Sequence, residues 1–209
     1  MRGCIIGICE DRVDNRGGTL HVLEYFARKQ RRVCRSTFAA ELNAIADALE
    51  TTRLVNLTIA CCHKPVTDAI RLQKLEDNGE LPLKIEVFTD CRSVYDALAS
   101  EDTKTPTESS LVLILHMIKE LLVAHVVKHL TWINTNDMLS DGLTKGGVSR
   151  KALFELSSSG SWFLKHECKT HSESHKRAIG STFLLNRLRH TASGFLCMLS
   201  EVLAPHTPK

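Results

Sequence analysis

Glu41, Asp90 and Asp141 are the residues of this chain best suited to chemistry, and they lie about fifty residues apart. Each belongs to a different expected element. Asp90 directly follows the apolar run at 83–88, at the C-terminal mouth of an expected buried strand, where open α/β sheets bind their ligands. Carboxylate oxygens are the ligands that Mg²⁺ and Mn²⁺ prefer. Three of them on separate elements could form a metal-dependent site that hydrolyses phosphodiester bonds.

The composition is that of an ordinary globular protein. Its 209 residues suffice for one core with an extension, and the formal net charge of +3 excludes a histone-like, purely electrostatic nucleic-acid binder. The eight cysteines form no CxxC pair and several lie in apolar runs, which predicts buried free thiols in a reducing compartment. The N-terminal apolar run is too short for a signal peptide, and no run approaches the roughly 20 residues of a membrane span. We therefore expect an intracellular protein of the cytoplasm or nucleus, outside any membrane.

The elements that would position the acids follow from the periodicity of the sequence. Residues 3–9 and 19–26 predict two strands, joined through a turn at 14–18. Ser36 is a suitable N-cap for a helix with one apolar stripe. Glu41 lies about 60° from the centre of that stripe, on its flank. A carboxylate at this position faces the edge of whatever the helix packs on.

The rest of the chain alternates between expected helices and strands. Helical patterning continues to residue 72, and Asp137 begins an expected short helix that runs through Asp141. The other expected elements are strands at 83–89 and 130–133, helices at 93–98, 108–123 and 151–165, a polar linker at 167–176 and an amphipathic stretch at 183–188. This order of strands and helices predicts an α/β fold.

Four phrases carry a family resemblance. They are Arg28-Lys29-Gln30-Arg31-Arg32-Val33, Ser36-Thr37-Phe38-Ala39-Ala40-Glu41-Leu42, Thr89-Asp90-Cys91-Arg92-Ser93, and Trp132-Ile133 followed by Asp141-Gly142-Leu143-Thr144-Lys145. In this order they make residues 3–165 resemble the ribonuclease H domain at the end of copia-type retrotransposon (retrovirus-related Pol) polyproteins. The resemblance implies a ribonuclease H-like mixed sheet flanked by helices in residues 1–165. Residues 166–209 would then be a linker and a C-terminal extension of unknown role.

The resemblance also implies an activity, the hydrolysis of RNA in RNA–DNA hybrids. In that family four carboxylates hold two Mg²⁺ or Mn²⁺ ions, and Glu41, Asp90 and Asp141 match the second, third and fourth. The family's first carboxylate is an Asp on the strand that opens the fold. Segment 3–9 has no acid and aligns better with the family's second strand. We therefore expect an N-terminally truncated domain that lacks the first central strand, with impaired catalysis.

A basic segment before the expected first helix is a candidate contact for nucleic acid. Lys and Arg side chains clustered there would hold the phosphates of a hybrid. The alternative is a solvated edge strand whose charges prevent strand addition. The candidate residues are Arg28, Lys29, Arg31, Arg32 and Arg35. The expected partners are an RNA–DNA hybrid or another nucleic acid and, within a polyprotein, the reverse transcriptase region.

The acidic candidates have simpler alternatives. Asp90 could cap the helix that follows it, while Glu41 and Asp141 could face solvent. Loss of the first carboxylate could leave a non-catalytic fragment that binds nucleic acid weakly. Asp11 and Asp14 in the turn are the nearby acids that could substitute for it.

Histidine and cysteine offer weaker possibilities. His129 precedes the last expected strand and could shuttle protons, or it could bind a transition metal together with His125 if both lie on a helix. Cys61-Cys62-His63 is expected to pack rather than to bind zinc. Asp137 is expected to be the N-cap of its short helix.

Overall fold

A computed structural model describes residues 2–10, 16–29, 34–63, 68–100, 106, 108–147, 150–172 and, for the backbone, 193–201. The strands are β1 (Arg2–Glu10), β2 (Gly17–Arg28), β3 (Lys84–Thr89), β4 (Val127–Ile133), β5 (Ser161–Phe163), β6 (Cys168–His171) and β7 (Ser193–Glu201). The helices are α1 (Thr37–His63), α2 (Ala69–Asp77), α3 (Arg92–Ala99), α4 (Ser109–Val123), the 3-10 turn η1 (Thr135–Asp137), α5 (Asp141–Thr144) and α6 (Lys151–Ser159). The protein is therefore a mixed α/β protein, as the sequence predicts.

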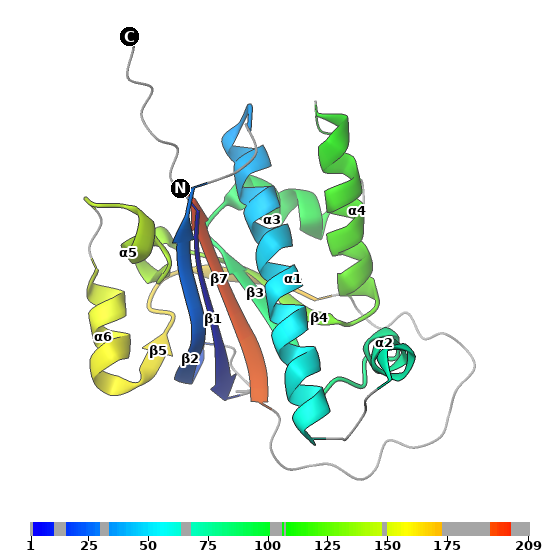
Figure 1. Ribbon diagram of the computed structural model, residues 1–209. Helices are drawn as coiled ribbons and strands as arrows, with labels where there is room; N and C mark the ends of the chain where they lie inside the picture. Colours follow the sequence, from blue (N-terminus) through cyan, green and yellow to red (C-terminus); the bar gives the residue numbers. More distant parts are fainter. Residues whose placement is uncertain are drawn as a thin grey trace.

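The strands follow the order β5-β2-β1-β7-β3-β4-β6 across the sheet. β1 and β2 form the expected antiparallel hairpin, whereas β3 and β4 are parallel and connected through α3 and α4. Helices α1, α3 and α4 lie on one side of the sheet, and α5 and α6 lie on the other (Figure 1). The C-terminal ends of β3 and β4 meet at one edge, where Asp90 follows β3.

The central position of the sheet is occupied by β7. This strand pairs antiparallel with β1, from Arg2↔Glu201 to Glu10↔Ser193, and parallel with β3, from Lys84↔Gly194 to Thr89↔Leu199. The sheet is expected to lack a central strand, but a segment from the other end of the chain occupies the central position. The continuous apolar run at 195–199 suits a strand that is covered on both faces. Pairing on both sides also satisfies backbone groups that would otherwise be exposed in mid-sheet.

The expected C-terminal extension contributes two strands to the same sheet. Besides β7, β6 pairs with the outer edge of β4. The helix expected at 151–165 ends earlier, because Gly160 adopts a left-handed φ of 65° and the chain continues as β5 along β2. The amphipathic stretch at 183–188 lies outside the described residues.

The core forms where α1 packs on the sheet. The Ser36 hydroxyl caps this helix by accepting the Ala39 N–H at 3.1 Å, as its position predicts. The apolar stripe of α1, including Leu42 and Ile45, is buried against β1, β3, α3 and α4. A second apolar cluster around Trp162 lies beneath α5 and α6. The two clusters hold β3 from both faces and so fix the position of Asp90.

Several local expectations need correction. The helical pattern to residue 72 belongs to two helices, α1 and α2. The expected helix from Asp137 to Asp141 is instead η1, a turn and α5. Among the seven cysteines whose side chains are described, all are free but only Cys4 is buried. No helix in the described ranges is long and apolar enough to cross a membrane.

Candidate active site

Asp90 lies at the C-terminal end of β3 and does not cap α3. The N-cap of α3 is Cys91, without a side-chain hydrogen bond. The Thr135 hydroxyl donates to Asp90 Oδ2 at 3.2 Å, and the Trp132 indole N–H donates to the Asp90 carbonyl at 3.0 Å. The capping alternative is therefore wrong, and β4 with η1 holds the aspartate in place. Burial raises the pKa of Asp90, the Asp141 carboxylate raises it further, and Lys145 and Thr135 act in the opposite direction.

Asp141 begins α5 and is fully buried, which excludes the solvent-facing alternative. Its Oδ2 lies 2.7 Å from the Lys145 ammonium nitrogen. Its Oδ1 is buried and has no hydrogen-bond partner among the described residues. A buried ionised oxygen without a partner is costly, so this atom marks a place suited to a further donor or a cation.

Glu41 is also buried, with 4% of its surface exposed. This burial excludes the solvent-facing alternative for Glu41. Burial raises the pKa of the Cys91 thiol, and the charges of Glu41 and Asp90 raise it further. Both carboxylates therefore lie close enough to Cys91 to act on it.

The three acids gather at one edge of the sheet without forming a single cluster. The Asp141 carboxylate acts electrostatically on Asp90, and Glu41 and Asp90 both act on the Cys91 thiol. Among the described residues, no group of three or more His, Cys, Asp or Glu side chains is arranged to hold a metal ion. The unpartnered oxygen of Asp141 and the hard oxygen donors of this pair suit one divalent cation. Glu41 is not part of that pair.

Glu201 is a further acid at this edge of the sheet, which the motifs in the sequence do not indicate. Asp11 and Asp14 lie outside the described residues. Glu201 ends β7 two residues after Leu199, which is level with Thr89. Parallel strands end at the same edge of a sheet, so Glu201 lies at the same edge as Asp90. The apolar run before Glu201 is the signal that could have identified this strand.

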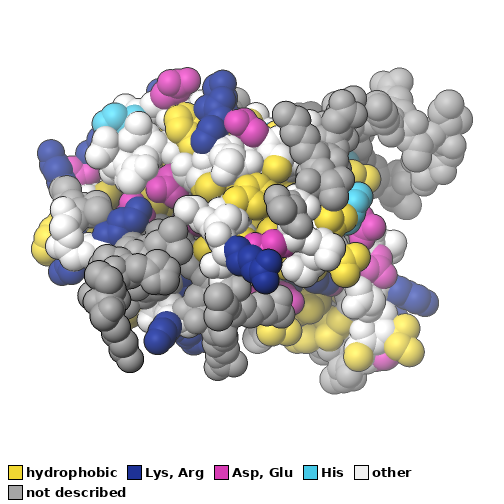
Figure 2. All heavy atoms as spheres, turned by 90° about the horizontal axis from the view of Figure 1, so that it is seen from above, with side chains coloured by type: hydrophobic (Ala, Val, Ile, Leu, Met, Phe, Trp, Pro, Cys, Tyr) yellow, Lys and Arg dark blue, Asp and Glu magenta, His cyan; other side chains and the backbone are white. Residues whose placement is uncertain are grey.

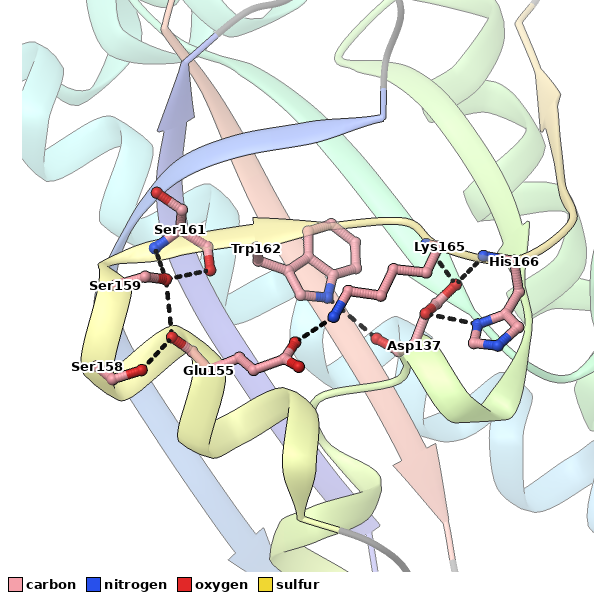
Figure 3. A network of polar contacts seen from close by, with 8 residues as sticks. All are labelled: Asp137, Glu155, Ser158, Ser159, Ser161, Trp162, Lys165 and His166. Atoms are coloured by element: carbon pink, nitrogen blue, oxygen red, sulfur yellow. Dashed lines mark hydrogen bonds and ion pairs between the residues drawn. The ribbon is translucent and has the colours of Figure 1, made fainter.

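Asp137 holds a second polar network beside this site and is not an N-cap. Its Oδ2 accepts the backbone N–H groups of Lys165 and His166 at 3.1 and 2.9 Å, and its Oδ1 contacts His166 Nδ1 at 2.8 Å (Figure 3). The Trp162 indole N–H donates to the Asp137 carbonyl. Asp137 therefore anchors the segment between β5 and β6, which we call the strap (Leu164–Glu167).

A cavity of about 390 Å³ lies next to the strap, between α6, β5 and η1. The Lys165 ammonium reaches across to Glu155 Oε2 at 2.5 Å (Figure 3). Both side chains are substantially exposed, so this ion pair contributes little to stability. Neither Asp90 nor Asp141 lines this cavity, although η1 contributes to its lining and also contacts Asp90 through Thr135.

Arg92 is a second cation near Asp90, besides Lys145. Its guanidinium stacks over the Trp132 ring at 4.8 Å and pairs with Asp96. In the expected basic segment, Arg28, Lys29 and Arg35 are exposed, while Arg31 and Arg32 lie outside the described residues. In the view from above, the described Lys and Arg side chains are interspersed with Asp and Glu (Figure 2). The visible charge of this face is therefore mixed rather than uniformly basic.

The roles suggested for His125 and His129 do not fit the positions of these residues in the structure. His125 lies in a turn with φ 55°, and His129 lies within β4, so the two do not form a helical i, i+4 pair. His129 is level with Glu86, three residues before Trp132, or about 10 Å along the strand from the acidic edge. Cys62 and His63 are exposed, and they belong to no metal-binding group in the described part of the chain.

Comparison of the chain with protein-family models, curated proteins and solved structures finds no match.

Proposed function

We propose that this protein is a ribonuclease H-like, metal-dependent endonuclease of retroelement type that hydrolyses RNA in RNA–DNA hybrids. The observation that carries this proposal is the pair Asp90–Asp141 at the C-terminal edge of parallel strands, with a buried unpartnered oxygen on Asp141. The position of β7 supports it too, because the ribonuclease H layout needs a central strand beside the one that ends at Asp90.

Each acid has a proposed role. Asp90 and Asp141 would hold one Mg²⁺ or Mn²⁺ ion, and Glu41 would serve a second ion or orient water near Cys91. Bound ions would supply hydroxide and neutralise charge on the leaving oxygen. Thr135 keeps the Asp90 carboxylate oriented through its hydrogen bond. Glu201 is the candidate for the position that the family fills from its first strand, because of its register beside β3.

The proposed substrate contacts are cationic. Arg92, held on Trp132 at the end of β3, is placed to contact a phosphate beside the acids. Arg28, Lys29 and Arg35, with Arg31 and Arg32 in the same segment, would contact the backbone further along the hybrid. Within a polyprotein, the reverse transcriptase region would be the adjoining partner.

The test is cleavage of a labelled RNA–DNA hybrid by the purified chain in Mg²⁺ and in Mn²⁺, beside RNA and DNA duplexes. Asp90→Asn and Asp141→Asn should each lower the rate about a hundredfold or more, since a lost metal ligand removes several kcal/mol of charge stabilisation. Asp77→Asn, an exposed acid on α2, is the matched control and should not change the rate. No cleavage by folded wild-type protein in either metal would favour a non-catalytic nucleic-acid-binding fragment.

A further inference from the structure

Lys145 is the cation that the structure places on the acid pair. It follows α5, and its ammonium nitrogen lies 2.7 Å from Asp141 Oδ2. Asp141 is fully buried, whereas the Lys145 side chain is 26% exposed. The same ammonium lowers the pKa of Asp90, so it acts on both carboxylates.

The Lys145 ammonium leaves one charge and one oxygen atom of the acid pair without a partner among the described residues. Two ionised carboxylates carry two negative charges, and one ammonium neutralises one of them. Asp141 Oδ1 stays without a partner while Oδ2 is paired. A divalent cation would neutralise both charges and occupy the vacant oxygen. It would also compete directly with the ammonium, because like charges repel at these distances.

We propose that Lys145 is a tethered counter-ion of the Asp90–Asp141 pair, which a divalent cation must displace in order to bind. This inference rests on the proposed metal site. The four-carbon stem of Lys145 reaches the site from its solvent-exposed rim, so the ammonium can withdraw without unfolding α5. Lys145 thereby stabilises the metal-free protein and lowers the affinity of the acid pair for a divalent cation.

The test measures Mn²⁺ affinity by the electron paramagnetic resonance signal of free Mn²⁺, together with thermal unfolding with and without Mn²⁺. Lys145→Met removes the charge. Lys145→Gln also removes it but keeps a hydrogen-bond donor for Asp141, in case the first variant does not fold. Lys165→Met is the matched control, because Lys165 pairs with Glu155 at an exposed position outside the acid pair.

We expect both Lys145 variants to unfold at a lower temperature than wild type without metal. They should bind Mn²⁺ more tightly, on the order of tenfold, as expected for removal of a typical competing interaction. Lys165→Met should leave the affinity unchanged. Mn²⁺ binding that is equal in wild type and in both Lys145 variants, yet abolished by Asp141→Asn, would overturn this inference and leave the proposed function intact. No Mn²⁺ binding by any of these proteins would overturn the metal site itself.

Discussion

The Asp137 carboxylate makes two contacts with His166. It accepts the His166 backbone N–H at 2.9 Å and contacts the imidazole Nδ1 at 2.8 Å (Figure 3). The strap held in this way connects β5, which pairs with β2, to β6, which pairs with β4. A single buried carboxylate therefore ties together segments that pair with different strands of the sheet.

Asp137→Ala should lower the free energy of unfolding by about 3 kcal/mol, because it leaves two backbone N–H groups without an acceptor and removes a charged hydrogen bond. Asp137→Asn should cost less, since it keeps one oxygen acceptor. His166→Ala should cost about 1 kcal/mol, since it keeps both backbone bonds. Urea unfolding measures all three. Equal losses in His166→Ala and Asp137→Ala would contradict the anchoring role of the backbone bonds.

Cys197→Pro should disrupt the sheet, because Cys197 lies in the central strand, opposite Ile6 and Val87. Proline removes a ladder donor there and should cost about 3 kcal/mol or more. Cys197→Val, which suits a strand, is the control. Hydrogen exchange should show lost protection of the amides of β1 and β3 in the proline variant alone. Unchanged protection in that variant would place β7 elsewhere.

Asp90→Asn should stabilise the metal-free protein near neutral pH. The pKa of Asp90 is raised by burial and by Asp141, so folding favours the protonated form. Its contribution to stability is therefore present below the ordinary pKa of an aspartate and is lost as pH rises through the folded-state value. Asparagine does not ionise, so Asp90→Asn removes this loss of stability. Urea unfolding in a chelator should show the gain at about pH 7 and little difference at about pH 3.5. A loss of stability at neutral pH would be contrary to this expectation.

Arg92→Gln should weaken hybrid binding and reduce the salt dependence of the affinity by about one phosphate contact. The reason is the position of the guanidinium on Trp132 beside Asp90. Arg71→Gln, an exposed substitution on α2, serves as the control. Affinities measured by fluorescence anisotropy over a range of salt concentrations give the slope. An unchanged slope in Arg92→Gln would remove this residue from the interface.

The sequence predicts those features of the fold and of the site that depend on residues close together in the chain. The apolar run before Asp90, the cap at Ser36 and the flank position of Glu41 each follow from residues within a few positions. β7 could not be found in this way, because its partners lie near the other end of the chain and in β3. The cap predicted at Asp137 is wrong for the same reason, since the donors to its carboxylate lie 28 and 29 residues further along the chain.

The most direct test of the acid pair is anomalous diffraction from crystals grown with Mn²⁺. We expect a peak about 2 Å from carboxylate oxygens of both Asp90 and Asp141. We also expect the Lys145 ammonium to have withdrawn from Asp141 Oδ2. A saturated crystal with no peak between these carboxylates, and with Lys145 still paired to Asp141, would contradict the metal site and the nuclease function built on it.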